Sequence, residues 1–265
     1  MGINEIQNTI NTELEKNSKW LKLNKLSLNV SKTHFMLFKR KRKIIDATPS
    51  LFIDSQTINQ VTHTKFLGVY IDEYLTWESH IDSISSKVAR GIGILRKARP
   101  YLNKSTVHQL YYTFVYPYLS YCNIVWGNTY MVHLSKLLIM QKKIVRIIEN
   151  TKFRAPTEDL FKKLKILKCH CIHKFQVAQF VYKYTENLLP PLFSYLFIQQ
   201  SSVHNHNTRG NSKYRPWKFS ISLSKRSIRY DGITFWNSLS NDIQTCQSLN
   251  SFKFNLKRFL IENHN

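Results

Sequence analysis

The spacing of apolar residues changes at Trp77, and this change constrains the fold more than any other feature of the chain. Before Trp77, short apolar runs are separated by polar turns, and the segments 51–53, 57–61 and 66–71 are typical of strands. After Trp77, apolar residues recur at three- and four-residue steps, as they do in amphipathic helices. The sequence therefore predicts an α+β fold in which a small antiparallel sheet precedes a mainly α-helical part.

Helical spacing also covers residues 3–21, which places one helix before the first strands. Further strand character is found at residues 34–38. The helices predicted beyond Trp77 cover residues 81–95, 107–118 with a kink at Pro117, 134–148, 169–188 and 249–259. Residues 199–218 are polar and predict a loop or linker. The chain thus divides into residues 1–76, residues 77–198 and residues 199–265.

Positive charge dominates the composition, with 39 lysines and arginines, 16 acidic residues and a net charge of +23. Between Glu15 and Asp46 there are ten basic residues and no acidic one, and the same holds between Asp82 and Glu149. Such density is self-repulsive, and a polyanionic partner would relieve the repulsion. Nucleic acid is the partner that this pattern favours, with a merely soluble basic protein and an anionic membrane surface as alternatives. No strongly amphipathic basic helix or apolar stretch of membrane-spanning length supports a membrane partner.

The cysteines and the N-terminus indicate the setting of the protein. Four cysteines in 265 residues do not form a disulfide scaffold, and residues 1–16 do not resemble a signal peptide. We therefore expect a reduced, intracellular location, in the cytoplasm, the nucleus or both. The string Cys169-His170-Cys171-Ile172-His173 contains metal-ligating residue types, but its cysteine spacing is not that of a structural zinc pair, and we expect no metal there.

Two strings near the N-terminus carry a family resemblance: NKLSLNVSKT at residues 24–33 and KFLGVYID at residues 65–72. RYDG at residues 229–232 and WNSL at residues 236–239 follow near the other end. In order and spacing, these strings resemble the reverse transcriptases of non-LTR retrotransposons of the jockey-like type, over nearly the whole chain. The first string is similar to the stretch that follows the catalytic aspartates of that family, and the second resembles its primer grip.

The resemblance implies that residues 1–76 end a polymerase palm, residues 77–198 form its thumb and connector, and residues 199–265 form a linker and helical tail. It implies RNA-directed DNA polymerisation as the parent activity, with Mg²⁺ as the parent's metal and an RNA template and a DNA primer as partners. The Tyr/Phe-x-Asp-Asp motif is missing, and the chain contains no Asp-Asp pair. Because polymerases hold two metal ions with carboxylates, we expect this part alone to bind primer–template without polymerising. The alternatives are a stand-alone basic nucleic-acid-binding protein derived from such an element, and a non-functional remnant.

The resemblance also implies roles for particular residues in the first part. Phe66, Leu67 and Gly68 would form the tip of a strand–turn–strand that approaches a sugar–phosphate backbone, where a glycine leaves room for close contact. The alternative is that Phe66 and Leu67 are ordinary strand core. Lys32 stands where the resemblance places a lysine near the incoming nucleotide, and it is a candidate for phosphate binding or proton donation. The alternative for Lys32 is a solvated turn lysine.

Candidate phosphate contacts fall into a basic run and into positions on, or just after, two predicted helices. The run at residues 39–43 could meet phosphates, act as a nuclear-localisation-like signal or form a solvated turn. The helical candidates would contact a duplex through its sugar–phosphate backbone. All the candidates are Lys39, Arg40, Lys41, Arg42, Lys43, Lys87, Arg90, Arg96, Lys97, Arg99, Lys142, Lys143 and Arg146.

Overall fold

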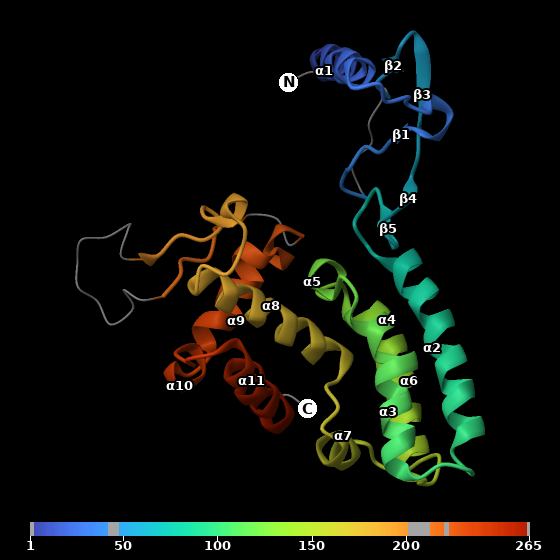
Figure 1. The fold of residues 1–265 in the computed structure, drawn as a ribbon, viewed down its shortest axis with the longest axis vertical. Coiled ribbons are helices and arrows are strands. Elements are labelled where there is room, and N and C mark those ends of the chain that lie inside the picture. Colours follow the sequence, from blue (N-terminus) through green and yellow to red (C-terminus); the bar gives the residue numbers. More distant parts are fainter. Residues whose placement is uncertain (1–2, 42–47, 201–212, 220–222, 264–265) are drawn as a thin grey trace. The chain divides into compact units, whose positions relative to one another are not determined.

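The computed structural model describes residues 3–41, 48–200, 213–219 and 223–263 (Figure 1). The chain divides into two compact units, Met1–His80 and Ile81–Asn265. Strands occur in the first unit and helices make up most of the second, so the predicted α+β class is confirmed. The predicted loop at 199–218 lies partly outside the described residues, and in its described part Gln199 forms a β-bridge with Tyr214.

The first unit contains one long helix and two small sheets. One sheet has the order β1-β3-β2, and the other pairs β4 with β5. The β2–β3 and β4–β5 pairs are antiparallel, whereas β1 runs parallel to β3, a pairing that the predicted antiparallel sheet did not include. The elements are α1 (Ile3–Leu23), the 3₁₀ turn η1 (Val30–Lys32), β1 (His34–Phe35), β2 (Leu51–Ile53), β3 (Gln56–Gln60), β4 (His63–Phe66) and β5 (Val69–Asp72).

Helix α1 is joined to β2 by packing and by side-chain amides. Ile10 and Leu14 pack against the buried side chains of Leu51, Ile53 and Ile58. Asn11 donates to the carbonyl of Ser50 over 3.1 Å and accepts from the backbone N–H of Phe52 over 3.0 Å. These amide contacts satisfy backbone groups along β2 that would otherwise lack a partner at the sheet edge. The helix therefore helps to bury the apolar side chains of this sheet and covers the sheet edge at β2.

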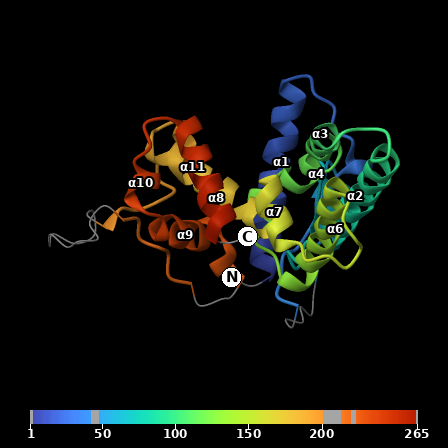
Figure 2. The same cartoon turned by 90° about the horizontal axis from the view of Figure 1, so that it is seen from below.

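The second unit is a helical assembly (Figures 1 and 2). Helices α3 and α6 pack side by side, and α8 packs against α6 and α11. The longer helices are α2 (Glu78–Ala98), which begins just before the unit boundary, α3 (Lys104–Phe114), α6 (Met131–Glu149), α8 (Cys169–Thr185) and α11 (Leu249–Asn263). The shorter ones are α4 (Tyr116–Ser120), α5 (Asn123–Trp126), α7 (Glu158–Leu164), α9 (Ile233–Ser238) and α10 (Asn241–Gln244), with single turns at η2 (Pro191–Phe193), η4 (Ser224–Arg226) and η5 (Ile228–Gly232).

A buried glutamine joins three of these helices. The amide nitrogen of Gln141 on α6 donates to the hydroxyl of Tyr111 on α3 and to the carbonyl of Leu167, both over 3.1 Å. Its amide oxygen accepts from the backbone N–H of Cys169 over 2.7 Å, at the start of α8. Because Gln141 is fully buried and bonded through both ends, it fixes the relative positions of the helices that it joins.

Two element predictions are wrong in their details. Residues 66–71 do not form one strand, since a two-residue turn at Leu67 and Gly68 separates β4 from β5. The predicted kink at Pro117 is a complete break at Val115, which separates α3 from α4. Proline is well tolerated in the first turn of a helix, so Pro117 lies in the first turn of α4 rather than bending a continuous helix.

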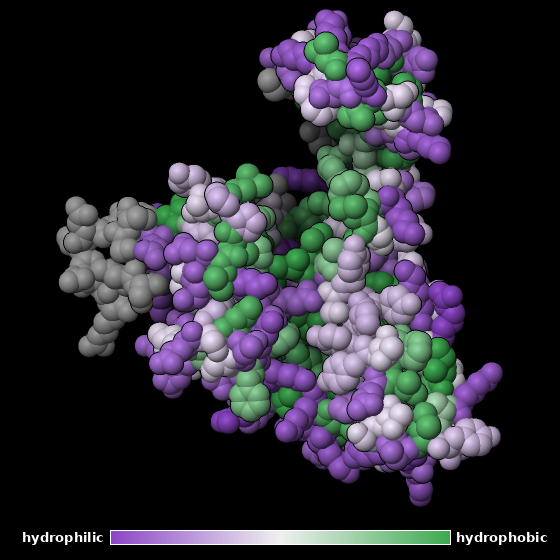
Figure 3. Space-filling view, in the orientation of Figure 1, coloured by the Kyte–Doolittle hydropathy of each residue, from purple (hydrophilic) through white to green (hydrophobic). Residues whose placement is uncertain are grey.

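Hydrophilic side chains cover much of the visible surface of the helical unit, and hydrophobic side chains form smaller patches between them (Figure 3). None of the helices within the described ranges combines the length and apolar content that a membrane-spanning segment requires.

Candidate nucleic-acid interface

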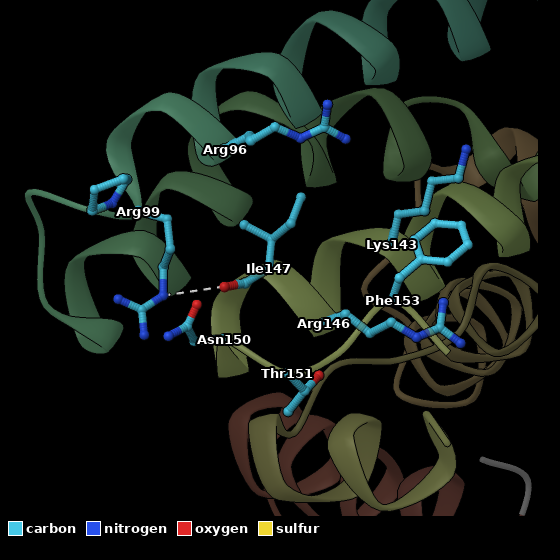
Figure 4. Close-up of a pocket in the computed structure, with 9 residues that line it drawn as sticks. Arg96, Arg99, Lys143, Arg146, Ile147, Asn150, Thr151 and Phe153 are labelled. Atoms are coloured by element: carbon cyan, nitrogen blue, oxygen red, sulfur yellow. Dashed lines mark hydrogen bonds between the residues drawn. The ribbon is translucent and has the colours of Figure 1, made fainter. Parts of the chain in front are cut away.

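Four basic side chains from two helices line one pocket of the second unit, here called the α2–α6 pocket. Arg96 reaches it from the last turn of α2, Arg99 from the position directly after that helix, and Lys143 and Arg146 from α6 (Figure 4). The pocket has a volume of about 400 Å³, and none of its nine lining residues is acidic. The other lining residues are Pro100, Ile147, Asn150, Thr151 and Phe153. The arrangement concentrates positive charge in one concave place.

The convergence follows from helical spacing and from the buried faces of the two helices. Each pair of cations is separated by three residues, which places its members on the same helix face. The cations lie near the C-terminal ends of α2 and α6, where the partial negative charge of the helix dipole favours them. The apolar faces that hold the helices in place include the buried side chains of Leu95, Ile144 and Ile148.

Two of the four cations are fixed by backbone carbonyls. Arg99 donates through Nε to the carbonyl of Ile147 over 3.1 Å and through Nη1 to that of Leu102 over 3.4 Å. Arg146 donates through Nε to the carbonyl of Ala155 over 2.9 Å. A guanidinium has five N–H donors, so both arginines keep further donors for an anion. These bonds orient the guanidinium groups and preorganise the pocket.

Phe153 and Asn150 also line this pocket, although neither was predicted from the sequence. Phe153 lines the pocket and is 74% exposed, and no periodic pattern marks its position. Asn150 ends α6 in the left-handed conformation, with φ of 54°. An asparagine directly after a periodic helical segment is a known C-terminal signal, and it could have located this end of α6.

The remaining helical candidates lie outside the α2–α6 pocket. Arg90 and Lys97 are exposed elsewhere on α2. Lys87 places its Nζ 5.3 Å from the centre of the Tyr118 ring, a cation–π contact. Lys142 is half-buried and lies close enough to Glu158 to help lower the pKa of that carboxyl, after the larger effect of its hydrogen bond with Lys168. Half of the basic residues predicted on these two helices therefore line the pocket, and the other half lie outside it.

The residues of the basic run at 39–43 have different surroundings in the structure. The ammonium of Lys39 lies 3.2 Å from a carboxylate oxygen of the buried Glu73 and 5.9 Å from the centre of the Tyr74 ring. Arg40 and Lys41 are exposed. Arg42 and Lys43 lie outside the described residues. Lys39 is thus engaged with the fold of its own unit, while its two neighbours face solvent.

The residues likened to a primer grip form the exposed tip of the β4–β5 hairpin. Phe66 is 62% exposed and Leu67 is 73% exposed, so neither belongs to the core. Leu67 and Gly68 both have positive φ, 45° and 85°, as a tight two-residue hairpin turn requires. Glycine adopts such a conformation easily, but leucine does so at a cost of roughly 1–2 kcal/mol. The tip therefore presents an apolar side chain on strained backbone.

The carboxylate of Asp72 organises the segment that follows this hairpin. It accepts hydrogen bonds from the backbone N–H groups of Tyr74, Thr76 and Trp77, over 2.9–3.1 Å, and from the hydroxyl of Thr76. Leu75 and Trp77 have positive φ, 52° and 64°, and these bonds hold the unusual backbone in place. The carboxylate is thereby committed to the chain's own backbone.

Lys32 is exposed at the end of the η1 turn, where its backbone N–H donates to the side chain of Asn29 over 3.2 Å. Within the ranges that the structure describes, no three His, Cys, Asp or Glu side chains come together as metal ligands. Cys169 and Cys171 are buried, and burial raises the pKa of the Cys169 thiol to about 12 and that of the Cys171 thiol to about 11. Thiols held in the protonated form are poor metal ligands.

Comparison with known proteins gives three relatives. The chain is 26% identical over 153 residues to a probable RNA-directed DNA polymerase from transposon X-element of Drosophila melanogaster. It is 27% identical over 167 residues to the RNA-directed DNA polymerase from mobile element jockey of Drosophila funebris, and 30% identical over 124 residues to that of Drosophila melanogaster. These alignments cover 56%, 62% and 45% of the chain but only 16%, 18% and 13% of the relatives, so the chain spans less than a fifth of the curated relatives it matches. No family model and no solved structure matches it.

Proposed function

The chain is related to the RNA-directed DNA polymerases of non-LTR retrotransposons, and from this premise we propose that its helical unit holds a primer–template duplex at the α2–α6 pocket. The observation that carries the proposal is the convergence of Arg96, Arg99, Lys143 and Arg146 on a pocket without an acidic lining residue. Basic side chains bind the phosphates of any sequence, which suits a protein that must hold every primer–template it meets.

We propose a second, smaller role for the β4–β5 hairpin of the first unit. Its tip at Phe66, Leu67 and Gly68 is exposed, and Gly68 adds no side chain to obstruct a sugar–phosphate backbone. This supports contact with the primer strand. The chain has no Asp-Asp pair to hold catalytic Mg²⁺, so we expect primer extension on an RNA template to yield no product with the chain alone.

The duplex proposal is tested by binding measurements on an RNA template annealed to a fluorescent DNA primer with a recessed 3′ end. Arg96 and Lys143 are exposed, so the double variant Arg96→Gln/Lys143→Gln should keep the fold. We expect it to bind more weakly. The slope of log K against log salt should become shallower by about two, because each lost phosphate contact removes roughly one released counterion.

The matched control is Lys97→Gln/Lys142→Gln, which removes the same charge from the neighbouring positions of the same two helices, outside the pocket. It should retain most of the affinity. Equal losses for the two double variants would show that net charge alone drives binding. A blunt duplex provides the second comparison, since equal affinity for blunt and recessed ends would favour a general nucleic-acid binder over a polymerase-derived grip.

A further inference from the structure

A second concave surface of the helical unit lies between α7 and α11, and it is here called the α7–α11 groove. It has a volume of about 450 Å³. Apolar atoms form most of its lining, in which Ile261 is buried and Phe254 is 68% exposed. The full set of lining residues is Lys162, Lys165, Phe254, Lys257, Arg258, Ile261 and Glu262. None of them lines the α2–α6 pocket.

The charge of this groove is unbalanced. Four of its seven lining residues are basic, and Glu262 is the single acidic one among them. Glu262 lies 3.4 Å from Nε of Arg258, so its charge is shared with a cation on the next turn of the same helix. Three lysines therefore face the groove without a carboxylate in its lining to neutralise them. An anionic ligand would supply the missing charge.

The lack of a neutralising carboxylate is clearest at Lys257. Its ammonium is partly buried against Tyr112, 3.4 Å from the hydroxyl and 5.6 Å from the ring centre. Burial lowers the pKa of Lys257, and the nearby charge of Lys165 lowers it further. The contact with Tyr112 does not outweigh these effects. An anion in the groove would oppose both, since it would stabilise the charged form of the lysine.

We propose that the α7–α11 groove binds single-stranded nucleic acid, with an unpaired base against Phe254 and phosphates at Lys162 and Lys165. An open aromatic ring beside basic side chains is the combination that single-strand binders use, since bases stack on the ring and phosphates pair with the cations. A paired base cannot offer its face to the ring, so the groove distinguishes single strands from duplex. This site is separate from the duplex proposal and does not depend on it.

The test uses the full chain and a fluorescent oligo(dT) of about ten nucleotides, within the usual site size of single-strand binders. Phe254→Ala should raise the Kd for this probe by roughly 5- to 150-fold, since stacking on one aromatic side chain contributes about 1–3 kcal/mol per base. Phe254→Tyr keeps an aromatic ring and should bind like the wild type. Lys162→Gln should weaken binding. It should also make the slope of log K against log salt shallower by about one, because one phosphate contact is lost.

Two controls separate this proposal from the previous one. Tyr195 is 89% exposed and lies outside the groove, so Tyr195→Ala removes an even more exposed aromatic residue and should leave the Kd unchanged. Phe254→Ala should also leave the affinity for a blunt duplex unchanged, whereas Arg96→Gln/Lys143→Gln should lower it. If Phe254→Ala and Lys162→Gln both bind oligo(dT) like the wild type, the single-strand proposal is overturned, and an acidic peptide becomes the better candidate for the groove.

Discussion

The positive charge of Lys168 is neutralised within the fold itself. Its side chain is only 10% exposed, it forms an ion pair with Glu158, and its ammonium lies 5.7 Å from the centre of the Phe161 ring. Arg96 has the opposite surroundings, since it is exposed and lines a pocket without acidic residues. The same kind of charge therefore stabilises the protein at one position and is available to a ligand at the other.

The Lys168–Glu158 pair should make stability depend on pH. The hydrogen bond from Lys168 holds the pKa of the Glu158 carboxyl below its usual value, so the native state takes up this proton less readily than the unfolded state does. The stabilisation is complete above the unfolded pKa and is lost as the pH falls through the folded one. Glu158→Gln should thus destabilise the protein at about pH 7 and have less effect at about pH 3, below the ordinary glutamate pKa near 4.3.

Urea unfolding of wild type and variant at both pH values measures this difference. A loss of stability of the same size at both would show that the carboxylate charge is not the cause. The pair was invisible in the sequence, because Glu158 and Lys168 are ten residues apart and meet only after α7 has formed. In the same way, helical spacing identified Arg96, Arg99, Lys143 and Arg146 as candidates, but their convergence depends on how α2 and α6 pack.

At the scale of elements, the β4–β5 hairpin offers a test with two opposite outcomes. Leu67→Asn should stabilise the hairpin by up to about 1 kcal/mol, because asparagine tolerates the left-handed conformation and little burial is lost. Leu67→Val should destabilise it, since a branched side chain suits that conformation least. Hydrogen exchange of the β4 and β5 amides would report both changes. Faster exchange in Leu67→Asn would mean that the leucine side chain stabilises the turn.

Periodicity predicted the helices well and the strands less well. Helices cover residues 3–21, 81–95 and 249–259 as expected, because each has an apolar stripe long enough to fix its period. The strand predicted at residues 66–71 was wrong because the turn begins at a leucine, a residue without turn signature. The parallel β1–β3 pair could not be foreseen, since it pairs only two residues of each strand, and the partner residues are 25 positions apart in the sequence.

At the scale of the molecule, the net charge of +23 is distributed over a chain that folds as two compact units. Self-repulsion opposes the compact state, and a polyanion that binds the native state would relieve it. Heparin should therefore raise the melting temperature at low salt, by an amount that grows with the logarithm of its concentration. The shift should disappear at high salt, because screening and lost counterion release remove the driving force.

Differential scanning calorimetry would measure this shift, with neutral dextran as the control for crowding. A rise that persists at high salt would contradict an electrostatic origin. Two compact units also allow two transitions, so the effect should be followed for each transition rather than for a single midpoint.

The lining of the α2–α6 pocket contains no histidine and no carboxylate. These are the side chains whose charge ordinarily changes between about pH 4 and pH 8. The positive charge of this pocket comes only from arginine and lysine, so we expect it to stay constant when its surroundings become acidic. Ionic strength, rather than acidity, is therefore the variable expected to weaken the polyanion binding proposed for this pocket.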